Sequence, residues 1–526
     1  MQGMFKEIEF TLPFLFSSFP FLFITSHLTS KVLTKYKLPL TYPFIIPTFA
    51  PPMIRKTIEN INITGTSSDG RAVARINDLV VFVQDAIPGD IGDIMIYKKK
   101  KSFMEGRLIN ITTPSPDRVT PFCEHFGICG GCKWQNMSYD AQLTFKQLQV
   151  EDALKRLAKI KLPEISKIIP SPSTKYYRNK LEFTFSNNRW LTIEEMQDES
   201  IKQKNALGFH TPQSFSKVID INHCHLQPDP SNQIRLSVKQ FVLENSLTFF
   251  DLKQQTGLLR NLIIRTSNTG EVMVIVCFHQ DEKEPIQNLM NHLSNQFPAI
   301  TSLLYVINPK GNDTIFDQDI IIFKGNDHII EEMPLADDNT RKLKFKIRAK
   351  SFFQTNSEQA QHLYQIAYSF ADLKGTEIVY DLYTGTGTIA NFIAHNAKKV
   401  IGIDNVPDAI DDAKENSITN GITNTSFFSG DLKSVLNDSF IIENGKPDVI
   451  ITDPPRAGMH EDVVKKLLEI EPDKIVYVSC NPATQARDLN LLDSKYELIK
   501  VQPVDMFPHT HHVENVVLLI KKANVS

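Results

Sequence analysis

Hydrophobic and polar positions in the C-terminal part of the chain repeat one pattern, a short apolar run that ends in a polar residue and is followed by a helix-like segment. Five such runs end in Asp381, Asp404, Asp431, Asp453 and Cys480. Alternating strands and helices predict an open α/β sheet, and ligands bind such sheets outside the carboxyl ends of the strands. We therefore expect these five side chains to point at one edge of one sheet.

Cys480 belongs to KIVYVSCNP, residues 474–482, where four strand-forming residues precede the cysteine and Asn481 and Pro482 end the run. A thiol at the ligand-binding edge of a sheet is a candidate nucleophile. The alternative is a small buried residue just beyond a strand. Taken alone, the cysteine favours neither interpretation.

The segment DLYTGTG, residues 381–387, predicts a strand, a glycine turn and a helix, and its glycines allow a ligand to approach the backbone amides of the helix start. Asp404 follows about 20 residues later, at the position from which an acidic side chain can bind ribose hydroxyls. Asp431 is placed to reach the edge of a base. The turn predicts a site for a nucleotide-like cofactor.

Asp453 begins DPPRAG, in which two prolines fix a rigid turn that can hold a planar substrate near the cofactor. Methyltransferases that act on exocyclic amines have an aromatic residue where this chain has Arg456. That difference weakens the interpretation as an amine methyltransferase. The target atom then needs another means of activation, which a cysteine can supply.

Four ionisable residues, His509, His511, His512 and Glu514, precede the last apolar strand. The histidines could indicate a metal site, but Glu514 at the start of a strand fits a general base better. Attack of the Cys480 thiolate on carbon 6 of a uracil would make carbon 5 nucleophilic, and Glu514 could then remove the carbon 5 proton. Both groups needed for methylation of carbon 5 are present.

Residues 54–113 form short apolar runs separated by turn residues, which predicts a small barrel of the OB type. The run of lysines at 98–101 fits either a solvated surface or phosphate contact. A second basic pattern lies at 341–350, where alternate positions of a predicted strand carry cations. We interpret this face as a footprint for a polyanion, with a solvated strand face as the alternative. Its cations are Lys342, Lys344, Lys346, Arg348 and Lys350.

Three cysteines, Cys123, Cys129 and Cys132, lie within ten residues among glycines that allow their sulfurs to converge. Cys224, in a polar turn-like segment, is the best candidate for a fourth ligand, because Cys277 lies in an apolar strand and is expected in the core. The spacing leaves open whether the site holds zinc or an iron–sulfur cluster.

The chain has 526 residues and a formal net charge of -3, so RNA or DNA contacts would have to come from local basic patches. Six cysteines in this length argue against a disulfide scaffold. Residues 1–52 are rich in phenylalanine and could be a signal peptide, an anchor or an extension. We favour a poorly ordered extension or a start set too early, with Met53 as the true start.

Several motifs occur together and in a fixed order: CEHFGICGGCKWQ, YRNK, SFFQTN, DLYTGTG, DPPRAG, SCNP followed by Arg487 and Asp488, and HHVE. In these the chain resembles the TrmA/RlmD-type RNA (uracil-5-)-methyltransferases from about Met53 to the C-terminus. It departs from many relatives at Thr384, where they carry cysteine, and in its N-terminal extension.

The resemblance implies a fold of three parts behind the extension (1–52): a TRAM β-barrel (53–113), a small α+β central domain (114–340) and a Rossmann-like class I methyltransferase domain (341–526). It implies Cys480 as nucleophile, Glu514 as base, and S-adenosyl-L-methionine as cofactor, held by Gln354, Tyr383, Asp404 and Asp453. It also implies a 4Fe–4S cluster on Cys123, Cys129, Cys132 and Cys224.

The expected substrate is a uridine of 23S rRNA, with tRNA as the alternative, and the expected location is the cytoplasm without membrane association or an obligate protein partner. A non-catalytic RNA-binding cluster protein is the alternative of a different class.

Overall fold

The computed structural model describes residues 56–198, 200–201, 204–212, 214–335, 337–338 and 340–523. The phenylalanine-rich extension, and with it the expectation for residues 1–52, lies outside them. Within the described part of the chain, no helix has the length and apolar character needed to cross a membrane.

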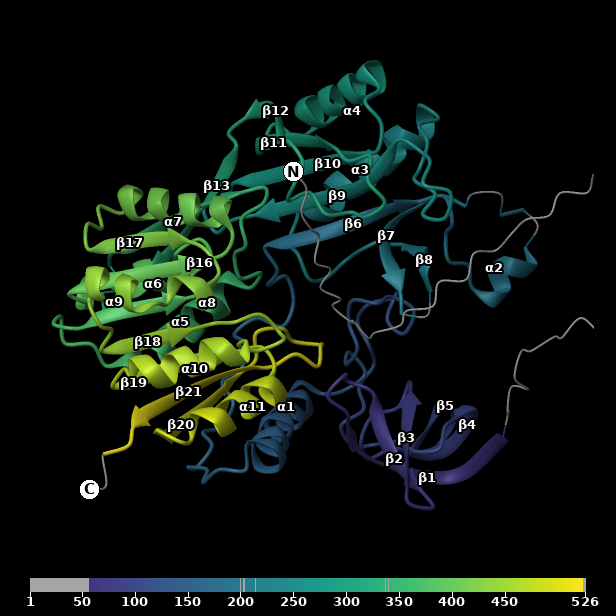
Figure 1. Ribbon diagram of the computed structural model, residues 1–526. Coiled ribbons are helices and arrows are strands. Elements are labelled where there is room, and N and C mark those ends of the chain that lie inside the picture. Colours follow the sequence, from purple (N-terminus) through teal and green to yellow (C-terminus); the bar gives the residue numbers. More distant parts are fainter. Residues whose placement is uncertain are drawn as a thin grey trace, which may run out of the picture. The chain divides into compact units, whose positions relative to one another are not determined.

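The first described segment is a closed barrel of five strands (Figure 1). Buried and exposed side chains alternate along the strands, and Ile63, Val81 and Ile94 are among the residues that fill the interior. This confirms the predicted TRAM-type barrel. Its strands are β1 (Lys56–Thr66), β2 (Ala72–Ile76), β3 (Leu79–Gln84), β4 (Ile91–Lys99) and β5 (Phe103–Thr113).

The central part of the molecule is a seven-stranded sheet with the strand order β12-β11-β10-β9-β6-β7-β8. Its middle strands β9 and β10 are buried on both faces; α3 and α4 supply apolar side chains to the core on one face. The strands are β6 (Lys180–Ser186), β7 (Ala206–Thr211), β8 (Ser214–Asp220), β9 (Leu259–Thr266), β10 (Val272–Phe278), β11 (Ile300–Ile307) and β12 (Ile321–Gly325). The helices are α2 (Ile193–Gln197), α3 (Ser231–Glu244) and α4 (Lys283–Gln296).

An antiparallel hairpin, β13 (His328–Pro334) and β14 (Lys342–Arg348), follows the central sheet and precedes α5 (Ser357–Ala371). It contains the predicted cationic face, which the ion pairs show to be largely neutralised. The pairs are Lys342 with Glu332 at 3.1 Å, Lys346 with Glu415 at 3.0 Å, Arg348 with Asp327 at 3.0 Å and Lys350 with Asp408 at 3.9 Å. Acidic residues from elsewhere in the fold occupy this face, so the ion pairs weaken the interpretation as a polyanion footprint.

The C-terminal part is a seven-stranded sheet with the order β17-β16-β15-β18-β19-β21-β20. Strands β15 to β19 run parallel, whereas β21 is antiparallel to both of its neighbours. Its strands are β15 (Ile378–Leu382), β16 (Lys399–Asp404), β17 (Thr425–Ser429), β18 (Val449–Thr452), β19 (Lys474–Ser479), β20 (Tyr496–Val504) and β21 (Glu514–Lys521). The predicted α/β sheet is confirmed.

Helices cover both faces of this sheet (Figure 1). On one face α5 packs with α6 (Thr388–Ile393), a 3₁₀ turn (Ala394–Asn396) and α7 (Pro407–Thr419). On the other face lie α8 (Leu432–Val435), α9 (Asp438–Asn444), α10 (Glu461–Ile470) and α11 (Pro482–Leu492).

Helix α1 (Tyr139–Ala153) is continued by a π-helical turn (Leu154–Ala158). Although it precedes the central sheet in sequence, it packs on the C-terminal sheet, where Val150 and Leu154 are fully buried in the core under α11. Asn490 Nδ2 donates a hydrogen bond to the Ala158 carbonyl at 2.7 Å. The central sheet is therefore an insertion between two segments of the C-terminal layer.

Candidate active site

One cavity of about 1130 Å³ opens at the carboxyl edge of the parallel strands. Its lining includes Asp431 and all six residues that are expected to act in catalysis or cofactor binding. These six are Gln354, Tyr383, Asp404, Asp453, Cys480 and Glu514. The chain thus brings together side chains that are separated by up to 160 positions in sequence (514 minus 354). The volume lies slightly above the usual range for small-molecule sites, roughly 300–1,000 Å³, which leaves room for more than a cofactor.

The glycine turn after β15 combines three residues in the left-handed conformation, Tyr383, Gly385 and Gly387, with φ of 62°, 54° and 73°. A side chain at Gly385 would meet no atom within 4 Å, whereas a Cβ at Gly387 would lie 2.8 Å from the Cβ of Ala413. Gly385 therefore leaves space at the cavity, and Gly387 is required for packing of the turn against α7.

Asp381 does not line the cavity, and its expected place at the cofactor edge was wrong. Its carboxyl group is buried under the turn, where its Oδ2 accepts hydrogen bonds from Thr384 Oγ1 at 2.5 Å and from the Ala390 amide at 3.1 Å. Burial raises its pKa to about 7. Thr384, the residue that departs from many relatives, thus ties the turn to the strand below it.

Asp404, at the end of β16, is held by the backbone around it. Its Oδ2 accepts the Gly385 amide at 3.0 Å and its Oδ1 accepts the Val406 amide at 2.9 Å, so that the carboxylate bridges the glycine turn and the next loop. Asp431 caps α8 by accepting the Lys433 amide at 3.1 Å. Both acids lie where the hydroxyls or amines of a nucleoside could bind.

Cys480 shares its part of the cavity with two acids, Asp453 and Glu514. Burial raises the pKa of both acids well above the usual range; the charge of Asp381 adds to this for Asp453, and the charge of Asp453 adds to it for Glu514. Burial, followed by the charges of Glu514 and Asp453, raises the pKa of the Cys480 thiol to about 11. A nearby cation would lower these pKa values, and the charge of Arg456 already lowers those of Cys480 and Glu514.

The DPPRAG turn is clamped by α11, the helix that begins directly after Cys480. Asn481 Nδ2 donates to the Arg456 carbonyl at 2.9 Å, and the buried Asp488 accepts the Met459 amide at 2.9 Å. Arg487 donates to the carbonyls of the same turn and pairs with Asp488 at 2.7 Å. The Arg and Asp of the recognised motif therefore fix the turn that carries Asp453 relative to the cysteine.

Three aromatic side chains at the cavity escaped the sequence analysis: Phe316, Phe352 and Phe507. Phe316 and Phe352 are 64% and 66% exposed, which is unusual for phenylalanine and suits stacking on a planar ligand. Phe352 lies within the SFFQTN motif, so the motif could have drawn attention to it. Phe316 lies in a loop of the central part without any motif, and its sequence carries no comparable signal.

A second cavity, of about 370 Å³, is lined by Cys123, Cys129, Cys132 and Cys224. Burial and the proximity of the other thiols raise the pKa of Cys129 to about 12 and that of Cys132 to about 11. Cys277 is buried in β10 and does not line this cavity. Among the described residues, no three His, Cys, Asp or Glu side chains are arranged to hold a single metal ion.

The cysteine cavity is adjacent to the first cavity. Gln135 Oε1 accepts the Cys123 amide at 3.2 Å, and the Cys224 amide donates to Asn232 at 2.8 Å. Thr355, next to Gln354, contributes to the lining of both cavities. The four thiols form one site, with room for a group larger than a single ion.

Comparison with known proteins gives two family matches. Residues 138–522 match the model for tRNA (Uracil-5-)-methyltransferase, and residues 53–109 match the TRAM domain. A Bacteroides thetaiotaomicron protein named as an uncharacterized RNA methyltransferase is 56% identical over 86% of this chain and 99% of its own length. A Porphyromonas gingivalis protein of the same name is 54% identical over 88% of this chain and 99% of its length.

Among solved structures, the tRNA (uracil-54, C5)-methyltransferase of Pyrococcus abyssi in complex with S-adenosyl-L-homocysteine is similar with a TM-score of 0.66 and 27% identity. The similarity covers 88% of this chain and 100% of that protein. The predictions of the family, of the fold class and of an RNA methyltransferase that uses S-adenosylmethionine are confirmed at the level of the family. The chain belongs to the tRNA (uracil-5-)-methyltransferase family and carries a TRAM domain ahead of its methyltransferase part.

Proposed function

We propose that the protein methylates carbon 5 of a uridine in RNA through a covalent adduct between Cys480 and carbon 6. The observation that carries this proposal is that Cys480 and Glu514 line the same cavity as the glycine turn. A nucleophile, a base and a cofactor site then surround one volume. In the proposed arrangement Gln354, Tyr383, Asp404 and Asp453 contact S-adenosylmethionine.

The reaction begins when the Sγ of Cys480, after loss of its proton to solvent, adds to carbon 6 of the uracil. The electron pair of the C5=C6 bond moves toward carbon 5 and O4 as an enolate. Carbon 5 then attacks the cofactor methyl group; the bond from sulfur to methyl breaks and its electrons stay on sulfur. Finally Glu514 takes the carbon 5 proton, the C5=C6 bond re-forms and the thiolate leaves.

The charges in the cavity fit this order of events. With raised pKa values, the thiol and the two acids favour their neutral forms when no cofactor is bound. S-adenosylmethionine carries a positive sulfonium, which favours the anionic forms of all three groups. Cofactor binding would therefore activate both Cys480 and Glu514.

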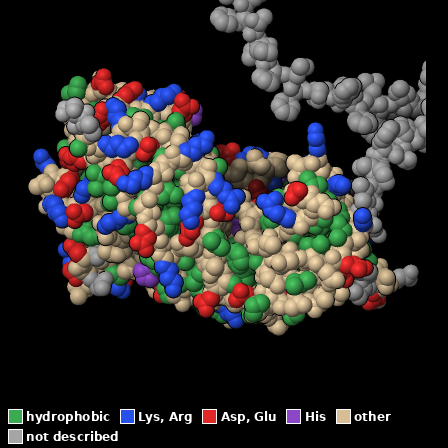
Figure 2. Space-filling view, turned by 90° about the horizontal axis from the view of Figure 1, so that it is seen from below, with side chains coloured by type: hydrophobic (Ala, Val, Ile, Leu, Met, Phe, Trp, Pro, Cys, Tyr) green, Lys and Arg blue, Asp and Glu red, His purple; other side chains and the backbone are tan. Residues whose placement is uncertain are grey.

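For the RNA itself, we propose a uridine of 23S rRNA, with tRNA as the competing substrate. The exposed rings of Phe316 and Phe352 suit stacking on unpaired bases, and an unpaired or flipped base is what such an enzyme must bind. Figure 2 shows Lys and Arg side chains beside a hollow on one face of the molecule, which would favour a polyanion.

We also propose that Cys123, Cys129, Cys132 and Cys224 hold a 4Fe–4S cluster. Four thiols around a cavity of about 370 Å³ match the donor set of such a cluster. A tetrahedral zinc site instead keeps its sulfurs at about 2.3 Å from one central ion. A bound cluster would tie the 123–132 segment to the segment that follows β8, and no step of the reaction passes through it.

The test uses rRNA and tRNA from a strain that lacks the gene, with purified enzyme and methyl-labelled S-adenosylmethionine. We expect 5-methyluridine in rRNA from the wild-type enzyme and background labelling with Cys480→Ala, while cofactor binding by the variant is unchanged. Labelling confined to tRNA would overturn the choice of rRNA. A methylated product other than 5-methyluridine, or full activity of Cys480→Ala, would overturn the mechanism.

A further inference from the structure

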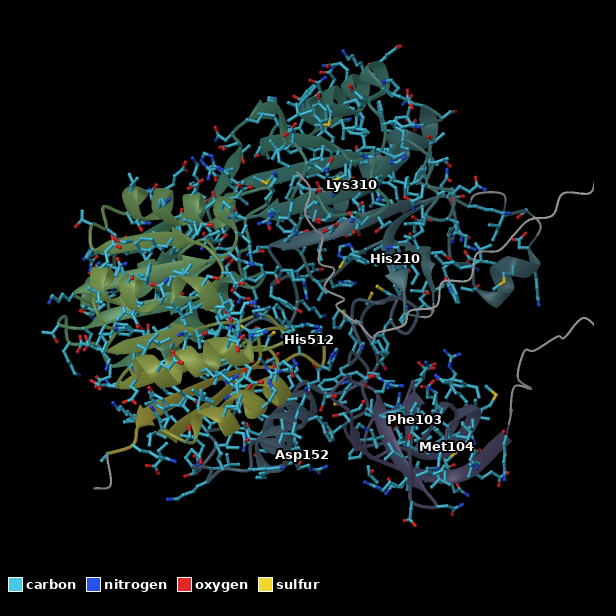
Figure 3. All side chains as sticks on the ribbon, viewed as in Figure 1. Phe103, Met104, Asp152, His210, Lys310 and His512 are labelled. Carbon is cyan, nitrogen blue, oxygen red and sulfur yellow. The ribbon has the colours of Figure 1, made fainter. Side chains whose placement is uncertain are left out.

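The loop between β20 and β21, residues 505–513, leads directly into Glu514 and is fixed by segments far away in sequence. It extends from the sheet toward the barrel and the cysteine segment, with His512 labelled on it (Figure 3). Nearest to the barrel, a Cβ at Gly70 would lie 2.7 Å from the Cβ of His511. Phe507 from the same loop lines the active-site cavity. The loop thus contacts the barrel at one point and the reaction site at another.

His509, in the middle of this loop, adopts a conformation that non-glycine residues rarely take, with φ of 65°. Such a backbone persists only where the surroundings hold it. Its amide donates to Gln142 Oε1 at 2.8 Å, and its carbonyl accepts the amides of Lys133 and Trp134 at 2.9 and 3.1 Å. Both backbone groups of the strained residue are therefore bound by residues outside the loop.

Gln142 is the side chain that joins these contacts. It is fully buried on α1, and its Nε2 donates to the carbonyls of Trp134 and Met137, each at 2.9 Å, while lying 3.2 Å from His509 Nδ1. One amide group thus connects the strained loop to the segment that follows the cysteines. Replacing it would leave buried polar groups without hydrogen-bond partners, which destabilises the loop.

The same loop is held at its start by a buried ion pair. Lys146, one helical turn beyond Gln142, pairs with Asp505 at 2.5 Å and donates to the Phe507 carbonyl at 3.0 Å. At its end, His512 contacts Arg456, a residue of the DPPRAG turn; Arg456 Nη2 lies 3.1 Å from His512 Nδ1. The loop runs between these anchors into Glu514, the first residue of β21, which pairs with Val504 of β20.

We propose that Gln142 is a positioning residue for the general base: by holding His509 in its left-handed conformation, it places Glu514 where the carbon 5 proton is removed. This inference rests on the proposed function, in which Glu514 acts after methyl transfer. It predicts a specific defect, because misplacement of the base slows release of the product from Cys480 without affecting the preceding steps.

The experiment compares Gln142→Met with Gln147→Met, a matched change on the same helix at a residue that bonds to Ile168 and Ser166 instead of the loop. Steady-state kinetics and the fraction of enzyme covalently bound to ordinary uridine RNA are measured. For Gln142→Met we expect a fall in kcat of tenfold or more, KM for RNA within twofold of wild type, and accumulation of the adduct. Gln147→Met should show neither kinetic effect.

A second variant separates positioning from a general loss of stability. Glycine adopts the conformation of His509 without strain, so adding His509→Gly to Gln142→Met should restore kcat at least threefold and lower the adduct fraction. A fall in kcat without adduct accumulation, or no rescue by glycine, would overturn the inference. If the wild-type enzyme forms no adduct even with 5-fluorouridine RNA, the proposed function fails instead.

Discussion

At the scale of single residues, the acidic side chains of the site disfavour the thiolate form of Cys480 that the proposed mechanism requires. Glu514 is buried and Asp453 half-buried near Cys480, and each negative charge disfavours another. The chain supplies Arg456, and the cofactor would supply the sulfonium. In the proposed mechanism, Cys480 stays protonated until the cofactor is bound, which would protect the thiol from unproductive reaction.

The first prediction concerns that dependence. Alkylation of Cys480 by iodoacetamide at pH 8 should be several-fold faster with S-adenosylmethionine than with S-adenosylhomocysteine, because the two have nearly the same shape but only the first has a sulfonium. The rate is measured by mass spectrometry of the Cys480 peptide. Equal rates with both ligands would show that the sulfonium does not lower the pKa of the thiol.

A second prediction concerns Asp381, whose folded pKa of about 7 lies above the ordinary value of 3.8. Between these two pH values the folded protein keeps a proton on Asp381 that the unfolded chain has released. The contribution of protonated Asp381 to the free energy of unfolding is therefore complete below about pH 4 and is lost as pH rises toward 7. Over that interval it changes by up to about 1.4 kcal/mol per pH unit.

The Asp381→Asn variant removes this titration. Denaturant unfolding at pH 5 and pH 8 should show a smaller loss of stability between the two conditions than wild type, with Asp453 and Glu514 accounting for the remainder. A variant with an unchanged difference between pH 5 and pH 8 would mean that Asp381 is ionised in the folded protein at both values.

At the scale of elements, the apolar runs predicted the parallel strands and the edge at which they end. The spacing of these runs and the alternation of strands and helices along the chain are enough to place that edge. They did not reveal the direction of each side chain. Asp381 lies only two residues before Tyr383, yet it points under the turn and not into the cavity. The cations of β14 share a face as predicted, but the acids that neutralise them come from β13, α7 and the loop before β13.

The glycine turn supplies the third prediction, based on its two left-handed glycines. Gly385→Ala adds a methyl group into open space at the cavity, so we expect a modest loss of stability, about 1 kcal/mol for the backbone, and at least tenfold weaker cofactor binding. Gly387→Ala forces a contact with Ala413 and should cost about 1–3 kcal/mol more in stability.

Calorimetric titration with S-adenosylhomocysteine and denaturant unfolding distinguish the two variants. Unaltered cofactor affinity of Gly385→Ala would place the ligand elsewhere in the cavity. A Gly387→Ala variant no less stable than Gly385→Ala would contradict the packing role.

At the scale of the whole molecule, contacts between distant segments decide the site. Residues 505–513 meet α1, the cysteine segment and the barrel, and Phe316 reaches the cavity from the central part. Sequence reasoning could not find these contacts, because they depend on how the layers pack, which the motifs do not specify. The cysteine site is different, because the spacing of Cys123, Cys129 and Cys132 and the glycines among them already predicted a site there.

The fourth prediction tests that site with a matched pair of cysteines. Cys224 lines the cysteine cavity, whereas Cys277 is buried in the core of the central sheet. After anaerobic purification, wild type and Cys277→Ala should each contain about four irons and four sulfides per chain, and Cys224→Ala should lose most of both. Iron and acid-labile sulfide are measured chemically. Zinc without sulfide in the wild-type protein would refute the cluster.

The central claim, a covalent adduct through Cys480, is tested most directly with 5-fluorouridine RNA and S-adenosylmethionine. Fluorine at carbon 5 cannot be removed as a proton, so the methylated adduct should persist through denaturation, and mass spectrometry should locate the nucleotide on the Cys480 peptide. Cys480→Ala should give none. Glu514→Gln should still form the adduct with 5-fluorouridine RNA, while its turnover on ordinary RNA falls by about 100-fold or more. Methylation of ordinary RNA with no trapped adduct, or an adduct on another residue, would contradict the account.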